Sequence, residues 1–116
     1  DAYIPVTMSV LDPADGKRKT MAQLAPLLTR SIHKIDLALN ASFAEYGFFG
    51  GVSIDFYYMG FQSGFLATKL LKGGAIKGAP VEDARRSIIA VNRKRMQALG
   101  IRLSPEARSI VDKWID

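Results

Sequence analysis

The period of the hydrophobic pattern changes near residue 55, and this change predicts a strand followed by a long helix. Residues 48–54 end in alternating apolar and polar positions, as in a buried strand. After Asp55 the spacing becomes helical and continues to the glycine pair at positions 73 and 74, which can end a helix. Asp55 itself is expected to cap the helix N-terminus, because its carboxylate can accept from the free N–H groups there. One stripe of the helix is expected to be buried, and it consists of Tyr58, Phe61 and Phe65 with Leu70 close by.

The rest of the chain divides into shorter elements of the same two kinds. Helical spacing resumes after the turn dipeptides Asp12–Pro13 and Asp15–Gly16, although Pro26 should kink or restart that helix. The final helix has the clearest signal, with Ser104 as its cap and Pro105 at its first position. The expected strands lie at 2–6, 35–39 and within 80–92, and the expected helices at 18–33, 92–99 and 104–115. The alternation predicts an α/β protein, a three-layer sandwich around a largely parallel sheet.

Composition narrows the class of protein. With 116 residues, 48% of them hydrophobic, the chain can form one packed domain or part of a larger one. It contains no cysteine, which excludes disulfides and thiolate metal sites. The net charge of +5 is spread along the chain, and the densest groups, 17–19 and 93–95, are interpreted as solvated surface, so no nucleic-acid partner is expected.

Catalytic signals are weak. The single histidine, His33, falls at a predicted helix end, where a cation matches the helix dipole. No Gly-x-Ser-x-Gly turn is present, and the carboxylates show no paired spacing on one helix face. Glycines at 47, 50 and 51 lack the spacing of a dinucleotide-binding loop. We therefore expect no catalytic residues, no metal site and no cofactor.

Small polar residues follow two of the predicted strands. Ligands of open parallel sheets bind beyond the carboxyl ends of the strands. Neutral hydrogen-bonding groups and an aromatic ring at that edge suit a polar organic molecule with an apolar part. The candidate ligand-binding residues are Thr7, Met8, Ser9, Asn40, Ser42 and Phe43.

Several segments together resemble one protein family. They are DAYIPV, HKIDLALNAS, GVSIDFYYMGFQSGFLATKLLKGG, VNRKRMQALGIRLSPE and VDKWID. The chain resembles the ABC-transporter substrate-binding proteins related to tryptophan- and tyrosine-binding lipoproteins, which have the type I periplasmic-binding-protein fold. The likeness runs through nearly all 116 residues but matches only the carboxyl-terminal part of such a protein.

The resemblance implies a two-lobed protein that closes on a small, amino-acid-like solute and delivers it to an ABC permease in the membrane. Residues 1–54 would be a βαβ portion of the second lobe, 55–79 a crossover helix packing on the first lobe, and 80–116 a return strand with C-terminal helices. Asp55 would lie at the crossing between lobes, as a hinge residue first and a ligand contact second. The location would be periplasmic or extracellular, with a lipid anchor, and the chain would associate with the missing N-terminal part or with a second copy.

Two alternatives remain open at this stage. The same fold serves ligand-sensing regulatory domains, which bind a solute without feeding transport. A small α/β enzyme is the other alternative, and it would need a nucleophile or a phosphate loop. The run Thr7-Met8-Ser9-Val10 also differs from the Asp-Asn-Thr-like run usual in the family, so the resemblance does not name the solute.

Overall fold

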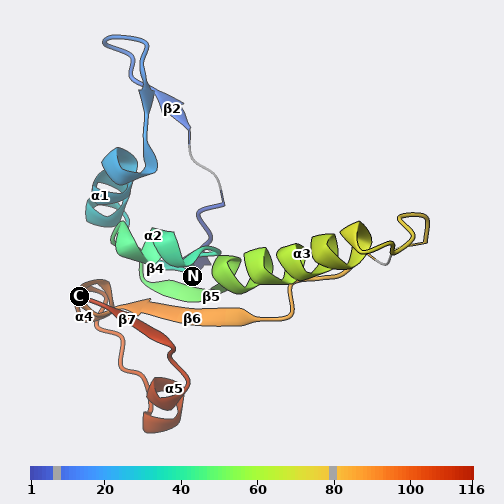
Figure 1. The fold of residues 1–116 in the computed structure, drawn as a ribbon. Coiled ribbons are helices and arrows are strands. Elements are labelled where there is room, and N and C mark those ends of the chain that lie inside the picture. Colours follow the sequence, from blue (N-terminus) through green and yellow to red (C-terminus); the bar gives the residue numbers. More distant parts are fainter. Residues whose placement is uncertain (7–8, 79–80) are drawn as a thin grey trace. The chain divides into compact units, whose positions relative to one another are not determined.

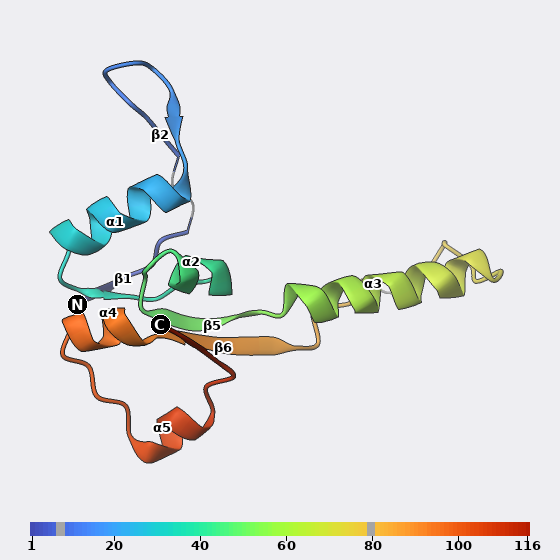
Figure 2. The same ribbon diagram turned by 60° about the vertical axis from the view of Figure 1, so that its left-hand side comes forward.

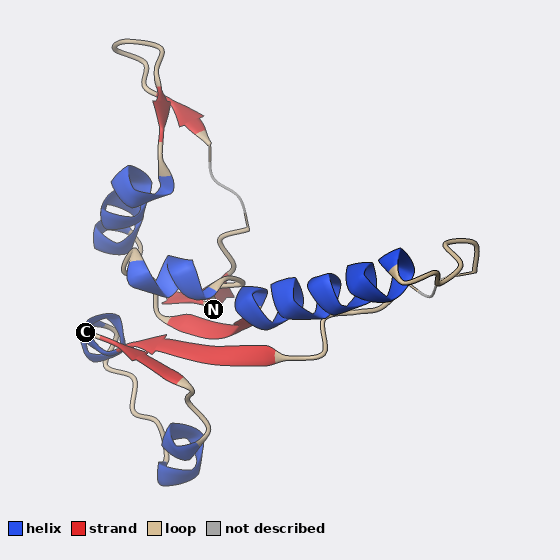
Figure 3. Ribbon diagram, in the orientation of Figure 1, coloured by secondary structure: helices blue, strands red, loops and turns tan. Residues whose placement is uncertain are grey.

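The computed structural model describes residues 1–6, 9–78 and 81–116, which divide into two compact units. The first unit contains Asp1–Ser53 and Ile88–Asp116, and the second contains Ile54–Ser87. Figures 1 and 3 show the helices and strands of both. The strands are β1 (Ala2–Tyr3), β2 (Val10–Leu11), β3 (Arg18–Lys19), β4 (Ile35–Asp36), β5 (Gly50–Ile54), β6 (Ser87–Asn92) and β7 (Lys113–Ile115). The helices are α1 (Met21–Ser31), α2 (Ala41–Glu45), α3 (Phe56–Leu71), α4 (Arg93–Ala98) and α5 (Pro105–Ser109).

The strand pairs of the first unit are of both kinds, parallel and antiparallel. β1 pairs with β4 and β6 with β7 in parallel, and a parallel bridge joins Leu37 to Gly50. β5 lies beside β6. The N–H of Asn92, at the end of β6, donates to the carbonyl of Phe49, just before β5 begins, so these two strands run in opposite directions. The fold is therefore mixed α/β with small sheets, and the prediction of a parallel arrangement fails between β5 and β6.

The core of the first unit lies between α1 and the strands. Phe48 is fully buried and packs with Ala25 of α1 and Ala38, which follows β4. Figure 2 shows α1 lying alongside β1. Burying a ring of this size stabilises a fold by about 1.5–3 kcal/mol relative to leaving it exposed. The partly buried side chains around this cluster are Tyr3, Met21, Leu28 and Phe43.

An antiparallel hairpin precedes α1, and it shortens the predicted helix. Arg18 and Lys19 belong to β3, not to a helix beginning at 18. The helix begins at Met21 because Thr20 caps it, with the Thr20 N–H donating to Gln23 Oε1 at 2.9 Å. Beyond that point α1 continues through Pro26 to Ser31, so the restart expected at Pro26 does not occur.

The predicted last helix is wrong in its second half. Ser104 caps α5 as expected, accepting from the Ala107 N–H at 3.2 Å, but the helix ends at Ser109. Residues 113–115 form β7, in which Trp114 pairs with Val91 of β6. Trp and Ile pack well on a pleated, half-buried surface, and β6 supplies such a surface beside residues 113–115. Tertiary pairing therefore overrides the helical spacing of these residues.

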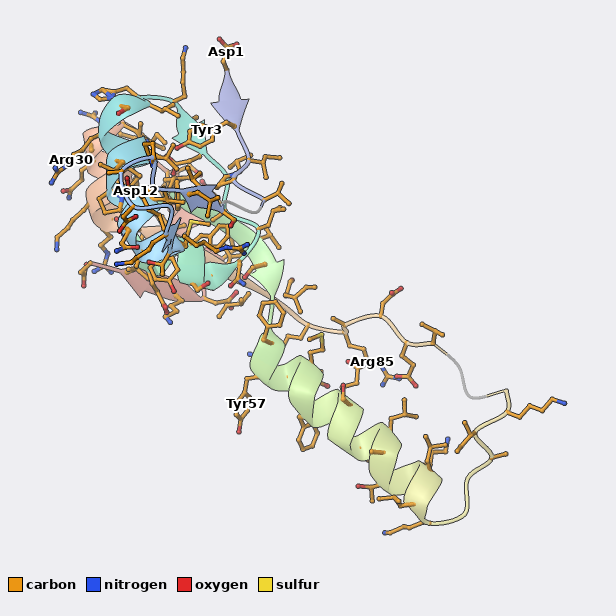
Figure 4. The ribbon with its side chains drawn as sticks, turned by 90° about the horizontal axis from the view of Figure 1, so that it is seen from above. Asp1, Tyr3, Asp12, Arg30, Tyr57 and Arg85 are labelled. Carbon is orange, nitrogen blue, oxygen red and sulfur yellow. The ribbon has the colours of Figure 1, made fainter. Side chains whose placement is uncertain are left out.

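The second unit consists of α3 and the segment that returns along it. Asp55 caps α3 as predicted, accepting from the Tyr58 N–H at 3.0 Å. No residue of α3 is buried among the described residues, and the exposed fraction of Phe65 is 70%. The predicted burial of Phe65 is therefore wrong within this chain, while Tyr58 and Leu70 are half-buried. Figure 4 shows Tyr57 on one side of the helix and Arg85, in the return segment, on the other.

Candidate functional site

Three of the predicted ligand-binding residues come together at the start of α2. Asn40 caps this helix, and its Oδ1 accepts from the Ser42 N–H at 3.1 Å and from Ser42 Oγ at 3.0 Å. Phe43 packs its ring 6.0 Å from that of Phe48, between centroids, and remains half-buried. Because Oδ1 of Asn40 is occupied, the amide Nδ2 and the Ser42 hydroxyl oxygen are the groups left to bind a solute.

Of the remaining predicted residues, the structure describes Ser9 and Asp55. Thr7 and Met8 lie outside the described residues, so the prediction for them stays a prediction. Ser9 is exposed and makes no side-chain hydrogen bond to any described residue. Asp55 belongs to the second unit, where its carboxylate caps α3 and lies 3.4 Å from Arg86 Nε. Its observed contacts are those of a cap residue.

A buried ion pair, which the sequence reading missed, lies in the first unit. Asp36 of β4 is fully buried, and its Oδ2 lies 2.6 Å from Nη2 and 2.8 Å from Nε of Arg95. Asp36 Oδ1 accepts from the Phe49 N–H. Arg95 also donates from Nη1 to the Thr29 carbonyl at 2.7 Å and from Nη2 to the Ile32 carbonyl at 2.8 Å. One guanidinium group therefore joins the C-terminal end of α1 to β4 and α4.

A signal for this pair was present in the sequence. Asp36 and Ala38 lie two positions apart, hence on the same face of a strand, within the apolar run 35–39. A carboxylate on a buried face needs a positively charged or hydrogen-bonding partner. Which arginine would supply it could not be read from spacing, because Arg95 lies 59 positions away in a segment interpreted as solvated surface.

Asn92 connects α2 to this network. Its Nδ2 donates to the Ala44 carbonyl at 2.9 Å, and its Oδ1 accepts from the Arg95 N–H at 2.8 Å. The same side chain thus caps α4 and holds the helix that carries Ser42 and Phe43. In Figure 2, α2 lies above β5, and α4 follows directly from the end of β6. The candidate site therefore rests on a fully hydrogen-bonded buried framework, which limits its movement.

The electrostatics of the framework affect Tyr3. Burial and the adjacent Asp36 carboxylate raise the pKa of the Tyr3 phenol above its usual value of 10.0, and Arg95 partly offsets the shift. The hydroxyl lies 3.4 Å from Asp36 Oδ2 and stays neutral at physiological pH.

The start of α2 presents an amide, a hydroxyl and an aromatic ring, which are groups that hydrogen-bond to and pack against small molecules. Among residues 1–6, 9–78 and 81–116, no cluster of three His, Asp or Glu side chains could hold a metal ion. His33 is exposed at the end of α1. In the same described part of the chain, no helix is both long and apolar enough to cross a membrane.

Comparisons with known proteins identify the fold. No family model matches the sequence, and no curated protein matches it. The structure does resemble solved structures. A conserved domain protein from Vibrio cholerae O1 biovar El Tor has a TM-score of 0.67 and 17% identity, over 81% of this chain and 31% of its own.

Two further similar structures are of proteins with a described function or ligand. One is CD0873 in its ligand-free, open form, a substrate binding protein with adhesive properties from Clostridium difficile, with a TM-score of 0.62 and 20% identity over 83% of this chain and 31% of its own. The other is the ABC domain in complex with L-Trp from Streptococcus pneumonia, with a TM-score of 0.66 and 24% identity over 84% of this chain and 35% of its own.

These comparisons show which fold the chain has and how much of the matched structures it spans. The chain has the fold of part of a substrate-binding protein, so the resemblance noted in the sequence is confirmed at the level of structure. It spans about a third of the length of the structures that it matches.

Proposed function

We propose that this chain is the solute-binding part of an ABC importer's substrate-binding protein and that it catalyses no reaction. The observation that carries the proposal is the fold, shared over four-fifths of the chain with a substrate binding protein and with an ABC domain that holds L-Trp. A solute-binding protein needs hydrogen-bonding and apolar groups at a rigid edge, and the start of α2 supplies both.

The proposed solute is a small, amino-acid-like molecule with an apolar part. Asn40 Nδ2 and Ser42 Oγ would bind its polar end, and the half-buried ring of Phe43 would contact its apolar part. Thr7, Met8 and Ser9 would complete the site from the neighbouring strand end. This part of the proposal is supported by the parallel pairing of β1 with β4, because the carboxyl ends of adjacent parallel strands share one edge. Asp55 would act mainly as the hinge at the crossing.

The proposed architecture follows the same likeness. Residues 1–54 and 80–116 would form part of the second lobe, a three-layer sandwich when complete, and 55–79 would pack on the first lobe. The partners would be a membrane permease and the first lobe or a second copy. Such a protein works outside the cytoplasm, in the periplasm or on the cell surface through a lipid anchor.

Ligand-dependent thermal stability tests the proposal. The purified chain, alone and joined to a first lobe, would be melted with each of the twenty amino acids. A ligand at 100 times its Kd stabilises the folded state by about 2.7 kcal/mol, which raises the Tm by several degrees. Ser42→Ala should reduce the shift, and the matched control Ser109→Ala, an exposed serine of α5, should keep it.

The alternatives predict different results. A regulatory domain would bind solute equally well but would show no affinity for a permease in a pull-down with detergent-solubilised membrane protein. An enzyme would convert its ligand, which mass spectrometry of the recovered solute would reveal. Failure of all twenty amino acids and of any co-purified molecule to stabilise the joined two-lobe protein would contradict solute binding.

A further inference from the structure

A groove of about 460 Å³ lies in the first unit, formed by three elements of the C-terminal segment. None of its lining residues is among those assigned to solute binding. α4, α5 and β7 contribute to it, and its lining residues are Arg93, Met96, Gln97, Arg108 and Trp114. Two guanidinium groups therefore share a groove with an indole ring and a thioether.

The aromatic wall of the groove is held in place. Trp114 pairs with Val91 across the parallel β6–β7 ladder, and the neighbouring pair is Asn92 with Ile115. The guanidinium carbon of Arg93 lies 4.9 Å from the centre of the Trp114 ring, within the range of a cation–π contact. An arginine stacked in this way loses less conformational freedom when it binds an anion.

The structure also shows what kind of group this stacked arginine binds. Arg93 Nη1 donates to Asp116 Oδ1 at 2.9 Å, and both side chains are substantially exposed. A carboxylate therefore already lies against the Arg93–Trp114 pair. Arg108, exposed on the same groove, has no ion-pair partner among the described residues.

Charge and shape together favour an extended acidic occupant. Residues 93–116 carry six lysines and arginines against three acidic residues, so the segment attracts anions. Three of the five lining residues are exposed, which makes the groove open, whereas small-molecule pockets enclose most of their ligand. Aromatic and arginine side chains are the residues that most often anchor protein interfaces.

We propose that this groove docks an acidic, leucine-containing segment of a partner protein. One carboxylate of the segment pairs with Arg108, a second replaces Asp116 on Arg93, and an apolar side chain packs on Trp114 and Met96. This binding is independent of the solute site at α2.

The test uses Trp114, the only tryptophan of the chain, as the probe. A tryptophan-free peptide with glutamates flanking leucines is titrated against the full chain while indole emission is recorded. We expect a saturable change with a micromolar Kd, weakened by roughly tenfold in Arg108→Gln, since a charge-assisted pair contributes about 1.4 kcal/mol, one factor of ten. Arg102→Gln, an exposed arginine outside the groove, is the matched control and should bind as the unchanged chain does.

A second variant distinguishes specific binding in the groove from a general electrostatic attraction of anions to the chain. Asp116→Asn removes the internal carboxylate and should tighten peptide binding severalfold, while circular dichroism confirms that the fold is kept. The proposal is overturned by equal affinity for the glutamine version of the peptide. It is equally overturned by a matching response to glutarate or polyuridylate, or by no emission change up to about 1 mM peptide, the weak end of specific binding.

Discussion

Asp36 and Arg95, 59 positions apart in the sequence, form an ion pair with 0% and 7% of their side chains exposed. The arginine simultaneously binds carbonyl groups at the end of α1, and the carboxylate binds the backbone just before β5. The pair thus connects parts of the first unit that the short strands alone would hold weakly. Its remaining hydrogen-bonding groups are satisfied, which is the condition under which a buried charge pair is tolerated.

Breaking this pair should destabilise the chain strongly. Arg95→Met leaves the Asp36 carboxylate buried without its cation, and we expect a loss of about 3–5 kcal/mol in the free energy of unfolding, measured in denaturant. Lys94→Met, at an exposed position of the same helix, should change it by less than about 0.5 kcal/mol. Adding Asp36→Leu to Arg95→Met should recover part of the loss, and a purely additive double variant would contradict the pairing.

How much the sequence predicts depends on whether the signal is local. The strand at 48–54, the cap at Asp55 and the helix up to Leu71 follow from residues that are neighbours in the chain, and the structure confirms them. The cap Ser104 is confirmed for the same reason, and Asn92 caps α4 through the same kind of local contact. A cap is a contact over two or three residues, so no tertiary information is needed.

The errors lie where distant residues decide. Trp114 is helical by spacing, but Val91 of β6 gives it a strand partner. The stripe containing Phe65 is apolar in the sequence. This pattern predicts that the stripe is buried, but it does not identify the segment that covers it. Of the candidate ligand-binding residues, Asn40 and Ser42 meet because they share one cap, and Ser9 makes no side-chain hydrogen bond to any described residue. That these residues bind a ligand stays a prediction.

Tyr3 should make stability depend on alkaline pH. Burial and Asp36 raise the pKa of its phenol, so the neutral form favours the folded state. The contribution of Tyr3 to the free energy of unfolding is therefore fully present below pH 10.0, the ordinary pKa of the phenol. It is lost as the pH rises through the raised pKa of Tyr3 in the folded chain. Denaturant melts at increasing pH should show this loss, and Tyr3→Phe should reduce it. Tyr57→Phe, at a 91% exposed position, should leave the loss unchanged; equal effects of both variants would contradict the assignment.

Gly50 should tolerate no side chain. Its φ is +120°, and a Cβ built there would lie 2.0 Å from the Ala90 carbonyl oxygen on β6. Gly50→Ala must move that backbone as well as adopt a strained angle, so we expect a loss of roughly 3 kcal/mol or more in the free energy of unfolding. The control is Gly60→Ala in α3, where the new Cβ would meet no described atom within 4 Å apart from the adjacent residues and the backbone of its own helix. It should be neutral or stabilising by up to about 1 kcal/mol, and similar results for the two would contradict this account.

Gln62 should hold the return segment against α3. Its Oε1 accepts from the Arg85 N–H at 3.2 Å, while Nε2 donates to the Asp83 carbonyl at 3.0 Å and to Glu82 Oε2 at 3.2 Å. Gln62→Ala removes all three contacts, and the Arg85 amide should exchange its hydrogen about three- to tenfold faster. Ser63→Ala removes only a bond within the helix and serves as the control. Unchanged exchange at Arg85 in Gln62→Ala would show that the contacts do not hold the segment.

The exposed face of α3 should be covered by something outside these 116 residues. Phe61 and Phe65 are 67% and 70% exposed, and Cβ atoms built at Gly60 and Gly64 meet no described atom within 4 Å outside the adjacent residues and the backbone of their own helix. Apolar area left in water forgoes about 25 cal/mol per Å², and soluble proteins seldom leave a large apolar patch uncovered. We therefore expect light scattering to show association of the purified chain at micromolar concentration, and a first lobe added in trans to replace that self-association.

The same face gives the sharpest mutational test. Phe65→Ala should change the free energy of unfolding of the monomeric chain by less than about 0.5 kcal/mol, since the ring has little to lose there. In the associated state the ring is buried, and the same change should weaken association by roughly tenfold or more, because truncating a buried aromatic anchor costs above 1 kcal/mol. Ser63→Ala, on an exposed position of the same helix, should alter neither quantity. A compact monomer that loses 3–5 kcal/mol on Phe65→Ala would mean that the chain buries this ring itself.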